Sequence, residues 1–412
     1  MTSAHRKEGA TAPVPETQPL PAEDDGHLSR QPDGGVLHGQ PWLTGVSRSP
    51  ALLSGPMTYR VIQWATGNVG RAAAEGIVAH PELELVGAWV HSPDKAGRDV
   101  GELCGIGPLG ILATGDEERL LALDADCVLY SPLLPDTARV VRILESGKNV
   151  VTPLGWFYPF VSIDVAAIEA ACQRGGATLH GTGIHPGGIT ERFPLMLSAL
   201  SSRIRHVRAE EFSDIRAYRA EFVVREIMLF GKDPETARTS PMLDLLGNGF
   251  GQSIDMVAAG LGISLDPEKL AVHELAVATA TIDAPAVTIA PGTVAAQRFS
   301  WHGTLGGEPV ITARVNWLMG ERHLDPPWTF GPEGERFEIE VEGEPAVRVT
   351  VHGLHPPDPA RDLERNPGLA ATAMHCVNAV PYVCRAEPGI RTYLDLPLIS
   401  GRHRASSRDA HR

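Results

Sequence analysis

Residues Val61 to Val90 read VIQWATGNVGRAAAEGIVAHPELELVGAWV, and this stretch decides the fold of the N-terminal part of the chain. The segment YRVIQW, residues 59–64, is apolar and β-branched, which predicts a buried strand; LELVGAWV, residues 83–90, predicts a second. Between them, NVGRAAAEGIVAH, residues 68–80, has its apolar residues at helical spacing. Strand, helix and strand in this order predict a βαβ unit with two parallel strands.

The turn between the first strand and the helix carries a GxGxxG fingerprint with alanine at its first position. It consists of Ala65, Thr66, Gly67, Asn68, Val69 and Gly70. Gly67 would let the backbone approach a pyrophosphate, and Gly70 would let the helix pack close to the strand. The free N–H groups of the helix N-terminus would bind the phosphates. Because the motif stands between a strand and a helix, it indicates a dinucleotide site rather than a purely structural turn.

The residues after the second strand bear on the choice of cofactor. An NAD site usually has Asp or Glu here, but this sequence has His91 and Ser92, with Lys95 and Arg98 close behind. Hydrogen-bond donors and positive charges suit a 2′-phosphate, so NADP(H) is favoured and NAD(H) remains possible. The alternative is that Lys95 and Arg98 are solvated loop charges.

The alternation of strands and helices continues to about residue 183 and predicts a doubly wound parallel sheet, the Rossmann fold. Further strands are expected at residues 111–115 (a weak one), 125–131, 148–153 and 177–183, and helices at 136–147 and 164–176. Residues 184–364 contain long alternating stretches, which predict a mostly antiparallel sheet. The fold class is therefore α/β, with an N-terminal Rossmann domain over residues 57–183 and an inserted α+β substrate and dimerisation domain.

The two ends of the chain differ from this pattern. Residues 1–56 are rich in Pro, Gly and polar residues, and we expect them to be disordered. The sequence leaves open whether Met1 or Met57 is the true start. Residues 365–400 predict a C-terminal helix and a segment that returns to the Rossmann domain, and residues 401–412 a disordered tail.

Composition excludes several classes of protein. The net charge of −14 argues against nucleic acid or an anionic membrane as partner. The five cysteines form no CxxC pair and are odd in number, which fits reduced thiols in a cytoplasmic protein better than disulfides or zinc. The N-terminus has no signal-peptide pattern, and no apolar run is long enough to span a membrane.

Several motifs outside the glycine turn are more specific. They are ATGNVGR at 65–71, GKNVVTP at 147–153, GTGIHPGGITERFPL at 181–195, GQSIDMVAAGLG at 251–262 and NPGLAATAMHCVNAVPYVCRAEPGIRTYLDLP at 366–397. In these the chain resembles the dihydrodipicolinate-reductase-like oxidoreductases, most closely the branch of 2,4-diaminopentanoate dehydrogenase and native amine dehydrogenases. The resemblance implies an NAD(P)-dependent oxidoreductase that acts on a small molecule, with a closing C-terminal helix and a homodimer.

The chain departs from that family at two places. Dihydrodipicolinate reductases carry a His-His-x-x-x-Lys segment and a Ser-Gly-Thr, whereas HVRAEEFSDIRAY at 206–218 has neither, so lysine biosynthesis is not expected. Amine dehydrogenases of this branch use a glutamate just after the fifth strand. Here the stretch after the fifth strand contains Leu154, Gly155 and Trp156 and no acidic residue, so the usual catalytic Glu is lacking.

In an open α/β sheet the chemistry takes place beyond the carboxyl ends of the strands. Three loops meet this condition: Ser131 with Pro132, Thr152 to Tyr158, and Gly181 to Gly188. The resemblance places the nicotinamide against them, so Ser131, Pro132 and Thr152 join the cofactor-binding residues.

Within these loops, His185 is the first candidate for the general acid, because imidazole titrates near neutral pH. Tyr158 is the second. The alternatives are a histidine that binds a loop carbonyl and a tyrosine that packs beside Trp156. Trp156 and Phe157 are predicted to line an apolar substrate pocket. No metal is assigned, because the carboxylates of EEFSD, residues 210–214, would alternate between the two faces of a strand.

These observations favour an oxidoreductase that transfers hydride to or from a small, apolar carbonyl, imine or amine. Two alternatives stay open: a catalytically silent protein that binds NADP(H) or senses a ligand, and an amine dehydrogenase whose base has been relocated. Fold alone does not choose among them.

Overall fold

The computed structural model describes residues 57–358 and 366–403. The predicted disorder of residues 1–56 and of most of the C-terminal tail lies outside the described residues. Of that tail, residues 401–403 are described, and Arg402 Nε donates to Glu82 Oε2 at 2.9 Å. Within the described chain no helix has the length and apolar character needed to cross a membrane.

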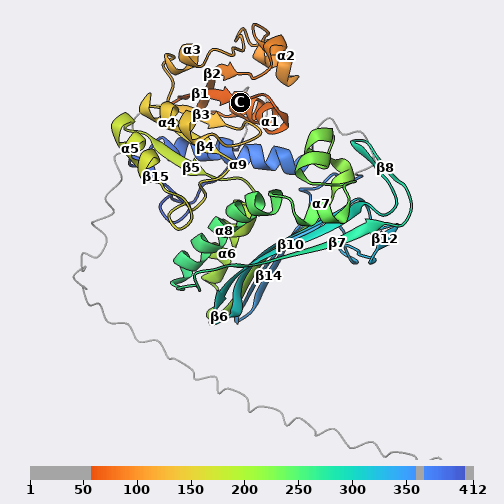
Figure 1. Ribbon diagram of the computed structural model, residues 1–412. Coiled ribbons are helices and arrows are strands. Elements are labelled where there is room, and N and C mark those ends of the chain that lie inside the picture. Colours follow the sequence, from red (N-terminus) through yellow and green to blue (C-terminus); the bar gives the residue numbers. More distant parts are fainter. Residues whose placement is uncertain (1–56, 359–365, 404–412) are drawn as a thin grey trace, which may run out of the picture. The chain divides into compact units, whose positions relative to one another are not determined.

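The N-terminal sheet has six parallel strands in the order β15-β5-β4-β3-β1-β2, which confirms the predicted Rossmann fold (Figure 1). The strand order reverses at β1, because β1 pairs with β2 on one side and with β3 on the other. In such a sheet the crevice for a ligand lies at this reversal, at the carboxyl ends of β1 and β3. The strands are β1 (Tyr59–Trp64), β2 (Leu83–Trp89), β3 (Cys127–Tyr130), β4 (Asn149–Thr152), β5 (Thr178–Gly181) and β15 (Gly389–Ile390).

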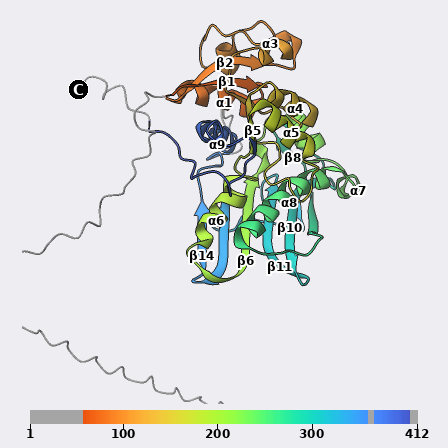
Figure 2. The ribbon, with the colours of Figure 1, turned by 90° about the vertical axis from the view of Figure 1, so that its left-hand side faces the viewer.

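Helices cover both faces of this sheet. On one face, α1 packs side by side with α9, and their apolar residues, Ile77 and Val380 among them, form one core with Val61 and Leu129 (Figures 1 and 2). On the other face, Ile143 of α4 and Ile168 of α5 form a second core. The helices are α1 (Asn68–Ala79), η2 (Pro93–Lys95), α2 (Val100–Cys104), α3 (Glu117–Leu121), α4 (Thr137–Glu145), α5 (Ala166–Gly175) and α9 (Pro367–Val383).

The weak strand predicted at residues 111–115 is wrong. This segment makes isolated bridges only, and it folds back on the loop that follows β2. The Asp99 carboxylate accepts hydrogen bonds from the N–H groups of Leu109 and Gly110, and the Val100 N–H donates to the Ile111 carbonyl oxygen. Thr114 forms one parallel bridge with the end of β2, since its N–H donates to the Ala88 carbonyl oxygen and its carbonyl oxygen accepts from the Val90 N–H. The segment therefore touches the edge of the sheet at one residue and forms no strand.

The second sheet has seven strands in the order β12-β7-β10-β11-β6-β13-β14, and only β6 and β11 are parallel, as the predicted mostly antiparallel sheet requires. Helices α6 and α8 pack on one face, where Phe250, Trp301 and Val315 share a core. The strands are β6 (Ser202–Asp214), β7 (Leu270–Ala278), β10 (Val294–Leu305), β11 (Glu308–Leu318), β12 (Leu324–Asp325), β13 (Arg336–Glu344) and β14 (Val347–Val351).

The remaining elements connect the two sheets or flank the second. The hairpin of β8 and β9 forms a separate two-stranded sheet. The elements are η3 (Gly188–Arg192), α6 (Phe193–Ser198), η4 (Ile215–Ala217), η5 (Val223–Ile227), α7 (Pro234–Arg238), α8 (Met242–Leu261), β8 (Ile282–Ala284) and β9 (Val287–Ile289).

Candidate active site

The glycine turn has the geometry that a pyrophosphate needs. A Cβ on Gly70 would lie 2.1 Å from the Ala65 carbonyl oxygen, so only glycine lets α1 start this close to β1. Gly67 has open space where its Cβ would be, and no side chain caps the helix that it begins. Ala65 takes the left-handed conformation, with φ of 76°, that the first glycine of the fingerprint usually provides. The turn therefore fits a dinucleotide.

A buried amide connects this turn to the loop after β3. Gln63 Nε2 donates to the Ala65 carbonyl oxygen at 2.9 Å and to Ser131 Oγ at 2.8 Å. Ser131 is buried and Pro132 is half-buried. Thr152 is fully buried at the end of β4, where its Oγ1 accepts from the Leu154 N–H at 3.2 Å. The structure thus brings the turn and Ser131 together.

The loop after β2 contains the four residues that are expected to bind the 2′-phosphate of the cofactor. His91 and Arg98 are exposed, whereas Ser92 and Lys95 are half-buried. Burial raises the pKa of the Cys104 thiol, and the positive charges of Arg71 and then Lys95 oppose that rise, so both cations lie near Cys104. Sequence reasoning missed Arg71, although it directly follows the last glycine of the fingerprint.

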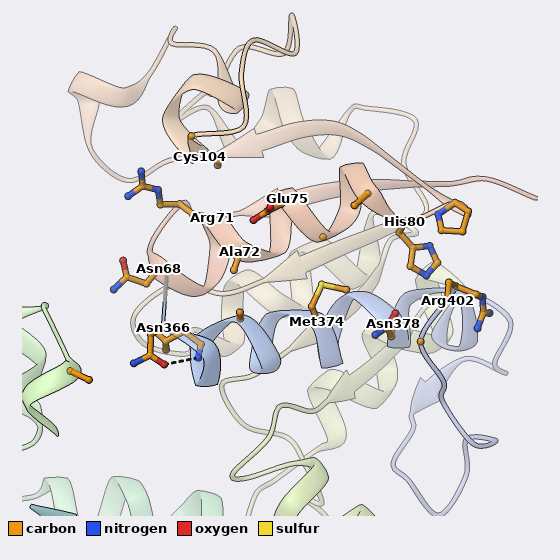
Figure 3. A pocket seen from close by; sticks show the side chains of 18 of the residues that line it. Asn68, Arg71, Ala72, Glu75, His80, Cys104, Asn366, Met374, Asn378 and Arg402 are labelled. Atoms are coloured by element: carbon orange, nitrogen blue, oxygen red, sulfur yellow. Dashed lines mark hydrogen bonds between the residues drawn. The ribbon is translucent and has the colours of Figure 1, made fainter. Parts of the chain in front are cut away.

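The larger cavity, of about 910 Å³, runs along α1 and α9. Figure 3 shows the two helices side by side, with Asn68 and Arg71 at one end and His80 and Arg402 at the other. The end of this cavity at Asn68 and Arg71 adjoins the glycine turn. It shares four lining residues with a smaller cavity, so the two adjoin; the shared residues are Ala217, Tyr218, Asn366 and Leu369.

The smaller cavity, of about 100 Å³, lies between the loop after β5, the ends of β6 and β13, and the start of α9. It includes Ile184 and His185 from the loop that sequence analysis placed at the nicotinamide. Its wall also contains three carboxylates and no Lys or Arg among the described residues; the carboxylates are Glu211, Asp214 and Glu335. Such a wall favours a cationic ligand over an anionic one.

Glu211 is buried and held in a fixed position. Its Oε1 accepts hydrogen bonds from Ser213 Oγ at 2.6 Å and from Trp317 Nε1 at 3.0 Å. Its Oε2 lies 3.8 Å from His185 Nε2. Burial raises the pKa of Glu211 above its usual range, against the two hydrogen bonds, which lower it.

Glu335 differs from Asp214, which stands beside it. Both Oδ atoms of Asp214 accept hydrogen bonds from Arg216 Nε at about 3 Å, so the guanidinium compensates the negative charge of Asp214. Glu335 Oε1 accepts the Asp214 backbone N–H at 2.6 Å. Burial raises the pKa of Glu335 to about 7. A carboxyl group that titrates near neutral pH suits a general base.

His185 lies in this cavity wall, but its ring is packed edge-on against Phe250 and Phe337, with centroids 4.8 and 5.6 Å away. Burial lowers its pKa to about 3, so it is neutral at neutral pH. Tyr158 is half-buried against Phe160 and lines neither cavity. The catalytic roles of His185 and Tyr158 stay predictions, and the geometry favours the carboxylates instead.

The apolar substrate pocket predicted at Trp156 and Phe157 does not coincide with either described cavity. Both side chains are 3% exposed, and Trp156 belongs to the core beneath α4 and α5. A Cβ on Gly181 would lie 2.6 Å from the Trp156 carbonyl oxygen, so this loop packs directly on β5. In the described residues, no group of three or more His, Cys, Asp or Glu could hold a metal ion.

A parallel sheet with a glycine turn, next to a cavity beyond its carboxyl ends, is the architecture of nicotinamide-dependent oxidoreductases. Comparison with known proteins agrees with this class. The family model for the 2,4-diaminopentanoate dehydrogenase C-terminal domain matches residues 191–411. An amine dehydrogenase of Streptomyces virginiae is 32% identical over 353 residues, which cover 82% of this chain and 96% of that protein.

Two further relatives also match this chain over more than four fifths of its length. The 2,4-diaminopentanoate dehydrogenase of Acetoanaerobium sticklandii is 23% identical and covers 82% of this chain and 93% of its own length. The solved structure of an amine dehydrogenase from Mycobacterium smegmatis has the same fold, with a TM-score of 0.67, 24% identity, and coverage of 84% of this chain and 97% of that one. The chain belongs to the family of 2,4-diaminopentanoate and amine dehydrogenases, as its motifs predict.

Proposed function

We propose that the protein is an amine dehydrogenase whose proton acceptor has moved from the loop after β4 to the second sheet. The observation that carries this proposal is the smaller cavity, whose wall contains Glu211 and Glu335 but no described Lys or Arg. The names of its relatives support an amine as substrate. The relocated base was one of the alternatives that the sequence left open.

An amine is an ammonium ion at neutral pH and must lose a proton before its carbon can give up hydride. Glu335, with a pKa of about 7, is the base in this proposal, because it is ionised in part at neutral pH and can pass a proton to solvent. Glu211 has one oxygen fixed by Ser213 and Trp317, which leaves Oε2 to accept an N–H of the substrate.

The bound cofactor supplies the hydride acceptor, and the oxidised amine is an imine that water hydrolyses to a carbonyl compound and ammonia. The glycine turn would hold the pyrophosphate, and Ser131 and Thr152 would border the nicotinamide side of the cleft. A cytoplasmic location and a homodimer belong to this proposal as well, supported by composition and family resemblance.

A panel of small amines, the matching ketones and aldehydes with ammonia, and amino acids tests the proposal. Cofactor absorbance would be followed in both directions. We expect turnover with amines that carry no carboxylate, because the cavity wall offers that group no described cation. Reduction of ketones without ammonia would instead support a simple carbonyl reductase. Cofactor binding with no turnover on any compound would support the ligand-sensing alternative.

We also propose that NADP(H) is preferred over NAD(H), supported by His91, Ser92, Lys95 and Arg98 in the loop after β2. In the double variant Lys95→Glu, Arg98→Glu, we expect NADPH affinity to fall by at least about 10- to 100-fold, which is the effect of losing a single charged contact, because two positive charges are reversed. NADH affinity should change by no more than about 2-fold, since NADH has no 2′-phosphate. Fluorescence titration measures both; an unchanged ratio of the two affinities would contradict this assignment.

A further inference from the structure

Arg71 stands in the first turn of α1, directly after the last glycine of the fingerprint. Its N–H donates to the Gly67 carbonyl oxygen at 2.8 Å, which closes that turn. Side chains of a helix lean toward its N-terminus, so a long side chain here reaches back past the start of the helix. Figure 3 shows the Arg71 side chain extended in this direction, in the cavity wall next to Asn68.

The charge of Arg71 is not compensated within the part of the chain that the structure describes. Its guanidinium forms no hydrogen bond and no ion pair with a described residue, and the side chain is exposed. Arg402, at the opposite end of the same cavity, differs because its Nε donates to Glu82 Oε2 at 2.9 Å. Arg71 is therefore available to an anion at the end of the cavity that adjoins the glycine turn.

The surroundings of Arg71 belong to the segment that follows β2. Cys104, the last residue of α2, lines the cavity with Arg71 and packs in one core with Ala73 of α1. Burial raises the pKa of the Cys104 thiol, and the charges of Arg71 and then Lys95 oppose that rise. Lys95 lies in the loop after β2, from which Rossmann folds bind the adenosine ribose. Two cations from different elements thus approach the same region.

Backbone groups in this region are not free to bind a second phosphate. The start of α2 is capped by the Asp99 carboxylate, which accepts hydrogen bonds from the N–H groups of Gly101 and Glu102. The start of α1, in contrast, has no side-chain cap and can bind the pyrophosphate. A 2′-phosphate must therefore be bound by side chains, and a planar guanidinium suits its oxygens.

We propose that the guanidinium of Arg71 binds the 2′-phosphate of NADP(H) together with Lys95. The residue after the glycine fingerprint would then take part in the choice between NADP(H) and NAD(H), which sequence analysis assigned to the loop after β2 alone. This inference rests on the proposed preference for NADP(H), and it is independent of the amine reaction.

Titrations with two pairs of ligands test the contact. NADPH differs from NADH only by the 2′-phosphate, and adenosine 2′,5′-bisphosphate differs from AMP in the same way. In Arg71→Gln we expect affinity for the two 2′-phosphorylated ligands to fall by about 10- to 100-fold, and that for NADH and AMP to change by no more than about 2-fold. Arg71→Lys keeps the charge without the planar fork and should lose less.

Arg119→Gln is the matched control, because it removes an exposed positive charge from α3 that lines neither cavity. It should leave all four affinities unchanged. Phosphorus NMR of bound NADPH gives a readout that a structural role would not move. Loss of a neighbouring cation should raise the pKa of the bound 2′-phosphate in Arg71→Gln and not in Arg119→Gln.

The outcomes separate this contact from the cofactor preference. If the unaltered protein bound NADPH no more tightly than NADH, the preference would fail and the contact with it. A preference that persisted undiminished in Arg71→Gln would overturn the contact alone. An equal loss for NADPH and NADH in a folded Arg71→Gln variant would place Arg71 at the pyrophosphate instead, and would also overturn the proposal.

Discussion

Glu335→Gln is expected to lower kcat/KM for amine oxidation by about 10²- to 10⁴-fold, the usual contribution of a general base. In the unaltered protein the rate should rise with pH through about 7, because only the ionised carboxylate can take the proton. The variant should lose this limb of the pH profile. The ionisation of the amine itself, near pH ~10, lies well apart and should remain.

Glu333→Gln is the matched control, because Glu333 is two residues away, half exposed, and does not line the cavity. It should keep both rate and pH profile. Thermal unfolding would show whether either variant is destabilised. If Glu335→Gln kept the limb near pH 7, Glu335 would not be the base, and Glu211→Gln would be the next variant to examine.

Gly70→Ala is expected to have the largest effect on both stability and cofactor binding. The new methyl group would meet the Ala65 carbonyl oxygen at 2.1 Å, and the backbone has to move because the clash is not with a flexible side chain. We expect a loss of about 2–3 kcal/mol in the free energy of unfolding. NADPH affinity should fall by about 10²-fold or more, since the turn and the first N–H groups of α1 move together.

Gly67→Ala separates these two effects. Its Cβ position has open space in the protein, and its φ of −71° suits alanine, so stability should change by less than about 1 kcal/mol. The methyl group would nevertheless stand where the pyrophosphate approaches the backbone, so cofactor affinity should fall strongly. Chemical denaturation and fluorescence titration of both variants give the comparison. Full cofactor affinity in Gly67→Ala would show that the turn does not hold the pyrophosphate.

The Rossmann elements could be predicted because each one carries its own pattern. YRVIQW and LELVGAWV form β1 and β2 at almost the predicted residues, and α1 begins at Asn68, directly after Gly67. The segment at 111–115 also has strand-like residues. Its backbone, however, bonds to the loop that follows β2 and, at Thr114, to the end of β2, and no local pattern reveals these partners.

The cavity wall could not be predicted for a related reason. Glu211 stands in EEFSD, a stretch considered only as a metal site, and Glu335 lies far away in the sequence. Pairing of β6 with β13 places Phe337 opposite Glu211, and this register brings the carboxylates to the same edge. A shift by one residue would turn them to opposite faces, and alternation alone does not fix the register. Arg71, in contrast, lies within a quoted motif and was overlooked.

The position of α9 and β15 has a consequence for how the protein is made. Both come from the end of the chain, yet α9 completes the core over α1, and β15 pairs with β5 at the edge of the first sheet. A nascent chain therefore exposes the apolar face of α1 and an unpaired sheet edge until nearly all of it has left the ribosome. At ordinary rates of translation this interval lasts roughly tens of seconds. The nucleotide-binding half is thus not an independent folding unit, and a premature stop before Pro367 would leave a product for chaperones and proteases.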